Sequence, residues 1–325
     1  KCRAMAPRRL ALISRGLIGM VSLRAAHTNA LVEPRLGFIG VGTIASAVVR
    51  GLCAGDETPP PSILLGPRSA VTAQALAAEF AGRVSVAPDN QAVVDGCDVL
   101  FLSVLPQQAS GVLEALCLRE DQLLVSLIST ASAASLARAA RLPESRVVRA
   151  LPLPAVGERS GVTPLWPAEE SVVRIFVRLG GAIAAADERE LLTLATVTCL
   201  VGQLYAQMGE AQEWLVGRGI ARAQASRYVT AVYAGAVSNS QEAAARAQVA
   251  AGDAEGDGSN SDVFRALVAE QTAGGINEQM LVAVRDGGAP DAFRGGLQAV
   301  HDRLQAGRAG GISPAPSVQP TSQPL

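Results

Sequence analysis

The stretch Gly-Phe-Ile-Gly-Val-Gly-Thr-Ile-Ala-Ser-Ala-Val-Val-Arg-Gly-Leu, residues 37–52, decides the fold of this chain. A short apolar strand at 36–39 leads directly into the turn Gly40-Val41-Gly42, and Ala45 takes the third small position. A helical spacing of apolar residues begins at Ile44. In such a pattern the first glycine permits a tight turn and the second lets a pyrophosphate approach the backbone. The third small residue allows close packing of helix on strand, and the first amides of the helix suit an anion. Placed between a strand and a helix, the pattern predicts a dinucleotide-binding site.

Strand and helix patterns alternate over residues 35–187, which is typical of a parallel sheet covered by helices on both faces. Within this region we expect a loop over 154–166. From 188 to 306 the patterns are helical, apart from a glycine- and acid-rich stretch at 251–262 that predicts an exposed loop. We therefore expect an α/β fold, with an N-terminal Rossmann-like dinucleotide-binding domain (35–187) followed by an all-helical dimerisation domain (188–306). The tail, 307–325, is rich in Pro, Gly, Ser and Gln and is predicted to be disordered.

The leader, residues 1–34, has a composition unlike the rest of the chain. It carries six basic residues and no acidic residue before Glu33, among Ala, Ser and Leu. This composition is typical of an organellar transit peptide, which predicts a mitochondrial or plastid location. The alternative is a disordered extension of a cytoplasmic protein. The apolar piece at 17–23 is too short to span a bilayer, and we expect no membrane partner.

Composition excludes several classes of chemistry. The net charge of −1 indicates no basic surface, so we expect no nucleic-acid partner. Five cysteines without a CxxC spacing favour free thiols in a reducing compartment. Lys1 is the only lysine, and His27 and His301 are the only histidines. A phosphate-loop ATPase, a Schiff-base enzyme, a dehydrogenase with a lysine acid and a histidine-rich metal site are therefore excluded, and we expect no metal.

The end of the second predicted strand indicates which dinucleotide is bound. In NAD-binding sheets this strand usually ends in Asp or Glu, which accepts hydrogen bonds from the ribose hydroxyls. Here the strand runs into Gly66-Pro67-Arg68-Ser69, with no carboxylate. A guanidinium pairs with a phosphate through two hydrogen bonds, so Arg68 and Ser69 favour the 2′-phosphate of NADPH, with NADH as the alternative.

Further motifs follow the glycine turn in a recognisable order. They are Pro88-Asp89-Asn90, Val104-Leu105-Pro106-Gln107, Arg146-Val147-Val148-Arg149, Gly157-Glu158, Gly161-Val162-Thr163 and Thr272-Ala273-Gly274-Gly275. With these motifs the chain resembles the pyrroline-5-carboxylate reductases from about Arg35 to Arg303. The resemblance implies a homodimer or larger homo-oligomer with interlocking helical domains. It also implies NADPH-dependent reduction of 1-pyrroline-5-carboxylate, a small cyclic imine, to proline.

The same resemblance implies roles for individual residues. The cofactor would be bound by the glycine turn, the Arg68 turn and the segment after the fourth strand: Gly40, Gly42, Thr43, Ile44, Arg68, Ser69, Asn90, Val104, Leu105 and Pro106. The substrate carboxylate would be held by the loop before a late helix: Thr272, Gly274, Gly275 and Ile276. Thr272 and Asn277 would orient the imine, and Glu278 would pair with the iminium charge. An acidic residue favoured by the helix dipole is the competing interpretation of Glu278.

The chain departs from the family pattern in the substrate loop. Two small residues, commonly threonines, usually follow the glycine pair, whereas this chain has Ile276 and Asn277. Leu105 replaces a lysine, and Leu151-Pro152-Leu153-Pro154 replaces a longer polar segment. Two alternatives therefore remain open. One is an NADPH-dependent reductase of a different imine or keto acid, and the other is a non-catalytic NADP-binding regulator.

Overall fold

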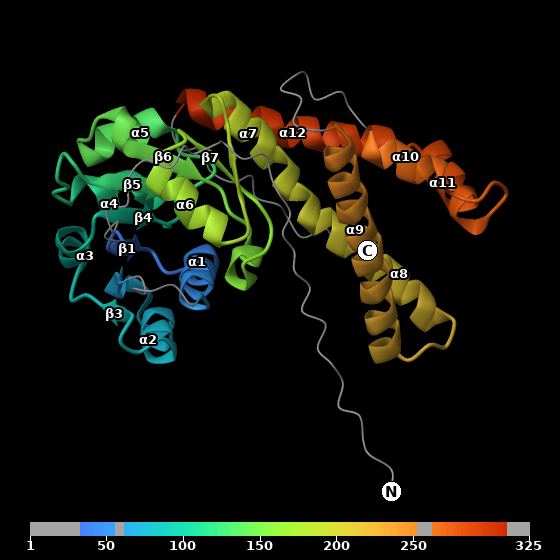
Figure 1. Cartoon of the computed structure of the whole chain (residues 1–325), viewed down its shortest axis with the longest axis horizontal. Coiled ribbons are helices and arrows are strands. Elements are labelled where there is room, and N and C mark those ends of the chain that lie inside the picture. Colours follow the sequence, from blue (N-terminus) through green and yellow to red (C-terminus); the bar gives the residue numbers. More distant parts are fainter. Residues whose placement is uncertain (1–32, 56–61, 252–261, 311–325) are drawn as a thin grey trace, which may run out of the picture. The chain divides into compact units, whose positions relative to one another are not determined.

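The computed structural model describes residues 33–55, 62–251 and 262–310 (Figure 1). These residues form two compact units. The sheet unit runs from residue 33 to 213 and resumes at 282, and the helical unit takes the described residues between 214 and 281. The predicted leader up to residue 32 and the predicted loop at 252–261 lie outside the described residues. The domain boundary predicted between residues 187 and 188 stays a prediction.

An eight-stranded sheet with the order β3-β2-β1-β4-β5-β6-β7-β8 forms the centre of the sheet unit. Its strands are β1 (Leu36–Ile39), β2 (Ile63–Leu65), β3 (Val84–Val86), β4 (Val99–Leu102), β5 (Leu123–Ser126), β6 (Val147–Ala150), β7 (Thr163–Trp166) and β8 (Ala182–Ala184). The first six strands are parallel, and the strand order reverses between β1 and β4. The expected Rossmann-like α/β fold is confirmed.

The loop predicted over 154–166 is wrong in part. Pro154–Glu158 forms a 3₁₀ helix, η4, and 163–166 forms β7, which runs antiparallel to β6 with Arg149 opposite Trp166. The sheet is therefore mixed at this end. This strand could not be recognised in the sequence because it has only four residues and contains Pro164, which has no amide to donate to a neighbouring strand. Gly161 just before it also favours a turn. Hydrogen bonding to β6 on one side and β8 on the other keeps these residues in a strand.

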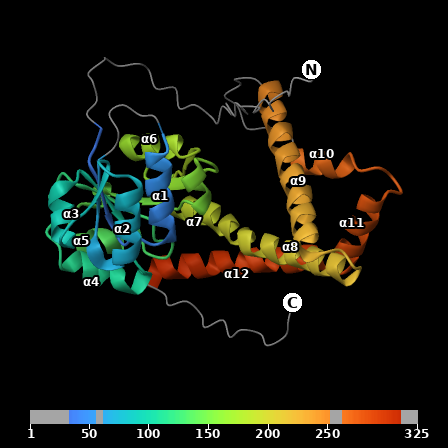
Figure 2. The ribbon, with the colours of Figure 1, turned by 90° about the horizontal axis from the view of Figure 1, so that it is seen from below.

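Helices cover both faces of the sheet (Figures 1 and 2). They are α1 (Thr43–Cys53), α2 (Ala70–Glu79), α3 (Asn90–Gly96), α4 (Ala109–Glu114), α5 (Ala133–Ala140) and α6 (Glu170–Arg178). Buried residues of α1, α2 and α6 share one apolar cluster, and those of α3, α4 and α5 share another on the opposite face. Ala, Val and Leu make up most of both clusters, as a chain with 3% aromatic residues requires.

Three of the few phenylalanines pack together in the first cluster. Phe38 of β1 stacks on Phe101 of β4 with ring centroids 4.6 Å apart, and Phe176 of α6 meets Phe101 edge-on at 6.5 Å. All three are completely buried. Aromatic pairs in these arrangements contribute about 0.5–1.5 kcal/mol beyond the area they bury. This contact holds the two strands that flank the reversal of strand order.

Three further helices contribute to the sheet unit. α7 (Glu188–Thr196) continues through η5 (Val197–Cys199) into α8 (Leu200–Gly217), and α12 (Ala289–Gly310) packs on α7. The tail predicted to be disordered from 307 is wrong over 307–310, which are helical, and its remainder lies outside the described residues.

The stretch 188–217 is long and apolar enough to cross a membrane by length and composition. Core helices of soluble proteins share this length and composition. Leu191 and Leu192 are buried with Leu304 of α12, so the first half is a packed helix of the sheet unit.

The helical unit contains the end of α8, α9 (Arg222–Ala251), α10 (Val263–Ala269) and the start of α11 (Ile276–Asp286). α10 packs on α9. Asp262 caps α10 by accepting a hydrogen bond from the Arg265 amide at 3.0 Å. The loop between α10 and α11 carries the residues predicted to bind the substrate.

Candidate functional site

The glycine turn after β1 has the geometry that a pyrophosphate site requires. Gly40 has φ +86°, and a Cβ at this position would lie 2.3 Å from the carbonyl oxygen of Ser103. At Gly42, by contrast, a Cβ would meet nothing within 4 Å, so the space above this residue is open. Gly42 is the N-cap of α1, and no side chain caps the first turn, which also carries no acidic residue. The first amides of α1, at Thr43 and Ile44, therefore have no acceptor within the helix. They lie at the positive end of the helix dipole, which favours an anion.

The exit of β2 lies beside this turn. The Gly66 amide donates to the Phe38 carbonyl oxygen at 2.8 Å, and a Cβ at Gly66 would lie 2.8 Å from Oδ1 of Asn90. Arg68 and Ser69 follow in η1 (Pro67–Ser69), with Arg68 exposed. Within the described residues Arg68 has no ion-pair or hydrogen-bond partner. A free guanidinium and no carboxylate at the end of β2 suit a phosphate on the ribose.

Asn90 and the segment after β4 complete this edge of the sheet. Asn90 opens α3, whose N-cap, Asp89, accepts from the Ala92 amide at 2.8 Å. A Cβ at Gly40 would also lie 2.9 Å from Cγ1 of Val104, so this side chain packs over the glycine turn. Leu105 is 58% exposed, and η2 (Pro106–Gln108) starts at the next residue. The structure thus brings the predicted cofactor residues together at the carboxyl edge of β1, β2 and β4.

This edge is the place where an open α/β sheet binds its ligand. The strand order reverses between β1 and β4, and ligands bind in the crevice outside the carboxyl ends of the strands at such a point. The residues present therefore fit a dinucleotide: an open approach at Gly42, free helical amides, and an Arg68 that has no partner among the residues that the structure describes.

A buried ion pair that lies near the same edge of the sheet was not predicted from the sequence. Nη1 of Arg149 in β6 lies 2.8 Å from Oε1 of Glu188 in α7, and the two side chains are 1% and 9% exposed. Arg149 also donates to the carbonyl oxygen of Ser129 at 2.7 Å, and Glu188 accepts from the amide of Ala133 at 2.8 Å. The available signal was an arginine on a strand of otherwise apolar residues, Val147-Val148-Arg149-Ala150.

The predicted substrate loop belongs to the helical unit. Gly274 has φ +72°, and its amide donates to Oε2 of Glu278 at 2.5 Å. Nδ2 of Asn277 donates to Oε1 of Gln271 at 2.7 Å. Ile276 is 84% exposed. The loop residues lie together around the N-terminus of α11, whereas the cofactor residues lie together in the sheet unit.

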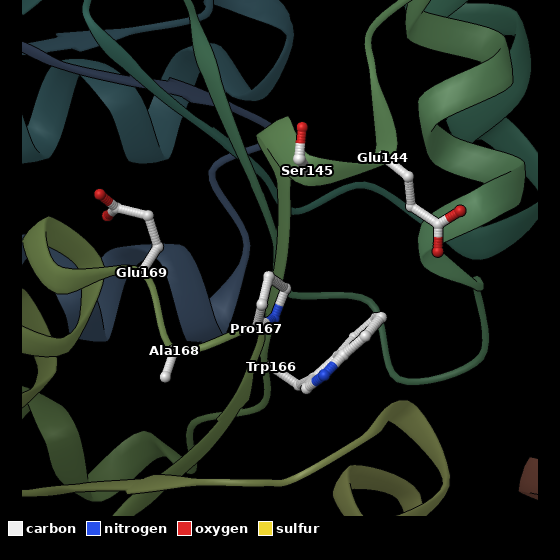
Figure 3. A pocket seen from close by; sticks show the side chains of 6 residues that line it. All are labelled: Glu144, Ser145, Trp166, Pro167, Ala168 and Glu169. Atoms are coloured by element: carbon white, nitrogen blue, oxygen red, sulfur yellow. The ribbon is translucent and has the colours of Figure 1, made fainter.

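A pocket of ≈450 Å³ lies elsewhere in the sheet unit (Figure 3). Glu144, Ser145, Trp166, Pro167, Ala168 and Glu169 line it. It is close to the start of β6 and the end of the antiparallel β7, so it opens at the edge opposite the glycine turn. Glu169 accepts a hydrogen bond from the Val172 amide as the cap of α6. The pocket is therefore not part of the candidate site.

The described residues contain no group of three His, Cys, Asp or Glu side chains that would hold a metal ion. His301 lies in α12, where its Nε2 is 3.3 Å from Oγ1 of Thr193 and 3.3 Å from Nε2 of Gln305. It has no place among the residues at the carboxyl edge of β1, β2 and β4.

Comparisons with known proteins give a consistent result. A family model described as "NADP oxidoreductase coenzyme F420-dependent" matches residues 35–130. The pyrroline-5-carboxylate reductase of Glycine max is 34% identical over 194 residues, which cover 57% of this chain and 68% of that protein. The enzyme of Pseudomonas aeruginosa is 34% identical over 135 residues, 41% of this chain and 48% of that protein. The matched region therefore spans about half the length of the bacterial relatives.

Solved structures show the same fold. The pyrroline-5-carboxylate reductase of Coxiella burnetii has a TM-score of 0.66 at 20% identity and covers 85% of this chain and 99% of its own. That of Plasmodium falciparum, solved with NADP bound, has a TM-score of 0.65 at 16% identity and covers 85% of this chain and 98% of its own. At these identities the likeness establishes the fold alone, an α/β sheet followed by helices.

Proposed function

This chain belongs to the pyrroline-5-carboxylate reductase family, and from that premise we propose that it reduces 1-pyrroline-5-carboxylate to proline with NADPH. The observation that carries the proposal is the open approach above Gly42, at the free N-terminus of α1 and at the reversal of strand order. This geometry suits a nicotinamide dinucleotide. The imine substrate is inferred from the relatives, which are pyrroline-5-carboxylate reductases.

The chain's own residues would bind and orient the reactants. NADPH, when bound, supplies the hydride. The first amides of α1 would hold the pyrophosphate, and Arg68 the 2′-phosphate. Thr272 and the Gly274–Gly275 turn would hold the substrate carboxylate at the start of α11, and Asn277 would orient the imine nitrogen. A protonated imine is already electrophilic, so this reaction needs alignment more than it needs a strong acid. That requirement suits a chain whose only lysine is Lys1.

The cofactor choice has a direct test. Arg68→Ala removes the phosphate partner, and a hydrogen bond to a charged group contributes about 1.5–3 kcal/mol. Because Arg68 is exposed, we expect the lower end, a loss of about tenfold in NADPH affinity with NADH affinity unchanged. Arg174→Ala is the matched control, since Arg174 is an exposed arginine of α6 paired with Glu170. An unchanged ratio of NADPH to NADH affinity in the Arg68 variant contradicts the assignment.

A second candidate function rests on the substrate loop. Asn277 already donates its amide to Gln271, and Glu278 already occupies the Gly274 amide. With Ile276 exposed, this loop offers a substrate different contacts from a pair of small hydroxyl residues. These contacts favour a reductase of another imine or of a keto acid as the runner-up.

One experiment separates the candidates. Purified protein is supplied with NADPH and either 1-pyrroline-5-carboxylate or a panel of other cyclic imines and keto acids, and the absorbance of NADPH is followed. Turnover fastest with 1-pyrroline-5-carboxylate supports the first proposal. Turnover only with another compound supports the second. NADPH binding without turnover of any compound supports the non-catalytic regulator.

We also propose that the protein is a homodimer or larger homo-oligomer. Large apolar side chains remain exposed along α8 and α9, among them Tyr205, Trp214 and Tyr228, each more than 60% exposed. Apolar surface of this extent on helices is typical of subunit interfaces. Light scattering after size exclusion gives the mass in solution, and a monomer at micromolar concentration contradicts this proposal.

A further inference from the structure

The buried ion pair of Arg149 and Glu188 makes more contacts than two charges need to neutralise each other. The guanidinium of Arg149 forks: Nη1 donates to Oε1 of Glu188 at 2.8 Å, and Nη2 donates to the carbonyl oxygen of Ser129 at 2.7 Å. The same Glu188 oxygen accepts from the backbone amide of Ala133 at 2.8 Å. The pair therefore joins β6 and α7 to two backbone groups that lie four residues apart.

These two backbone groups lie at the two ends of a single turn. Ser129 follows β5, and Ala133 is the first residue of α5; both elements are labelled in Figure 1. Residues 129–132, here the β5–α5 turn, are therefore held at both ends by Arg149 and Glu188. Nη2 of Arg149 also lies 3.5 Å from the carbonyl oxygen of Ile128. Within the turn, Ser132 caps α5 through its own hydroxyl group. Ser129, in contrast, is exposed.

The position of the turn relates it to the cofactor crevice. Neighbouring strands are about 4.8 Å apart, so β5 lies roughly 10 Å from β1 on the side of β4. Arg68, the candidate for the 2′-phosphate, follows β2 on the other side of β1. A dinucleotide whose pyrophosphate sits at Gly42 and whose adenosine end lies toward β2 extends its other end toward β4 and β5.

We propose that Arg149 and Glu188 are positioning residues that fix the β5–α5 turn as a contact for the nicotinamide half of the cofactor. The inference rests on the proposed function to the extent that the bound dinucleotide is NADPH. Replacing a buried ion pair by apolar residues of similar volume is often neutral for stability, so core stability alone does not account for two buried charges. Its requirement lies in the two backbone groups, which apolar side chains cannot bind.

The test compares two ligands that differ by the nicotinamide half. Full-length protein is titrated calorimetrically with NADPH and, separately, with adenosine 2′,5′-bisphosphate, which keeps the adenosine, the 2′-phosphate and the 5′-phosphate but lacks the nicotinamide half. Arg149→Lys retains the charge beside Glu188 but cannot reproduce the fork. We expect its NADPH dissociation constant to rise about tenfold, or ~1.4 kcal/mol, and that of the bisphosphate to change less than twofold.

Two further variants keep the test decisive. Arg149→Met/Glu188→Met removes both charges together, so no unpaired charge is left buried if the lysine variant does not fold. It should show the same selective loss. Arg35→Ala/Asp98→Ala removes an ion pair of 2.7 Å at the opposite edge of the sheet and should leave both affinities unchanged.

The outcomes separate this inference from the proposed function. Equal weakening of both ligands, or no weakening of NADPH, overturns the positioning role whatever substrate is reduced. A selective loss of NADPH supports it even if wild-type protein fails to turn over 1-pyrroline-5-carboxylate. Wild-type protein that binds neither ligand overturns both proposals.

Discussion

Two glycines in one turn should respond to the same substitution in opposite ways. Gly40→Ala places a methyl group 2.3 Å from the carbonyl oxygen and 2.6 Å from the carbonyl carbon of Ser103, both backbone atoms. Gly42→Ala places a methyl group where nothing lies within 4 Å. We expect the first variant to lose stability and the second to lose only its ligand.

The magnitudes follow from the backbone. At Gly40, with φ +86°, an alanine costs about 1–2 kcal/mol for the left-handed conformation alone. Displacing the Ser103 backbone adds about 1–3 kcal/mol. At Gly42, with φ −88°, alanine is conformationally ordinary, and stability should change by less than about 1 kcal/mol. A methyl group in the path of the pyrophosphate, however, removes at least two charge-assisted hydrogen bonds, or about 3 kcal/mol, which is ~150-fold in affinity.

Two measurements on each variant test this reasoning. Urea unfolding gives the free energy of unfolding, and fluorescence titration gives the NADPH dissociation constant. Gly111→Ala in α4 is the matched control, because a Cβ at that position also meets nothing within 4 Å and the residue is far from the glycine turn in sequence. If Gly42→Ala binds NADPH as tightly as wild type, the open space is not the pyrophosphate site. If Gly40→Ala is as stable as wild type, the steric argument is wrong.

Three further predictions concern ionisable groups. Burial raises the pKa of Cys97 to about 11, so the folded state keeps a proton that the unfolded chain loses near pH 9. Stability should therefore fall by up to about 3 kcal/mol between pH 9 and 11, and urea unfolding of Cys97→Ala should lack most of that fall. A thiol reagent at pH 8 should label the exposed Cys117 but not the buried Cys97. The hydrogen bond from Arg35 lowers the pKa of Asp98, so this carboxylate stabilises the fold above about pH 4, and the contribution is lost as the pH falls below that value. Because the pair is exposed, we expect the contribution to be under ~1 kcal/mol. Asp98→Asn should therefore lose less stability than wild type between pH 7 and pH 3 in urea unfolding, by that amount. Glu278→Gln keeps an acceptor for the loop amide but removes the charge, so an iminium partner predicts a KM for the imine raised about tenfold, and an unchanged KM leaves Glu278 as a helix cap.

Local patterns were enough to single out candidate cofactor residues that lie close together in the fold. The glycine turn, the absence of a carboxylate after β2 and the position of Asn90 depend on a few neighbouring residues, and the structure places all three at one edge of the sheet. β7 could not be predicted in the same way, because a four-residue strand containing Pro164 forms only through pairing with its neighbours. The role of Glu278 is similar: its sequence position allows either a cap or a charge partner, and the contact with the Gly274 amide appears only in the folded loop.

The sequence by itself determined the dinucleotide-binding fold and the family, since glycine spacing and strand–helix alternation are properties of short segments. Only the tertiary structure decided where Arg149 and Glu188 meet. They are 39 residues apart in the chain, on a strand and a helix, and neither has a local signature of pairing. Desolvation is the physical reason: a charge buried this deeply requires an opposite charge and hydrogen bonds around it, and the packing of β6, α5 and α7 decides which groups supply them.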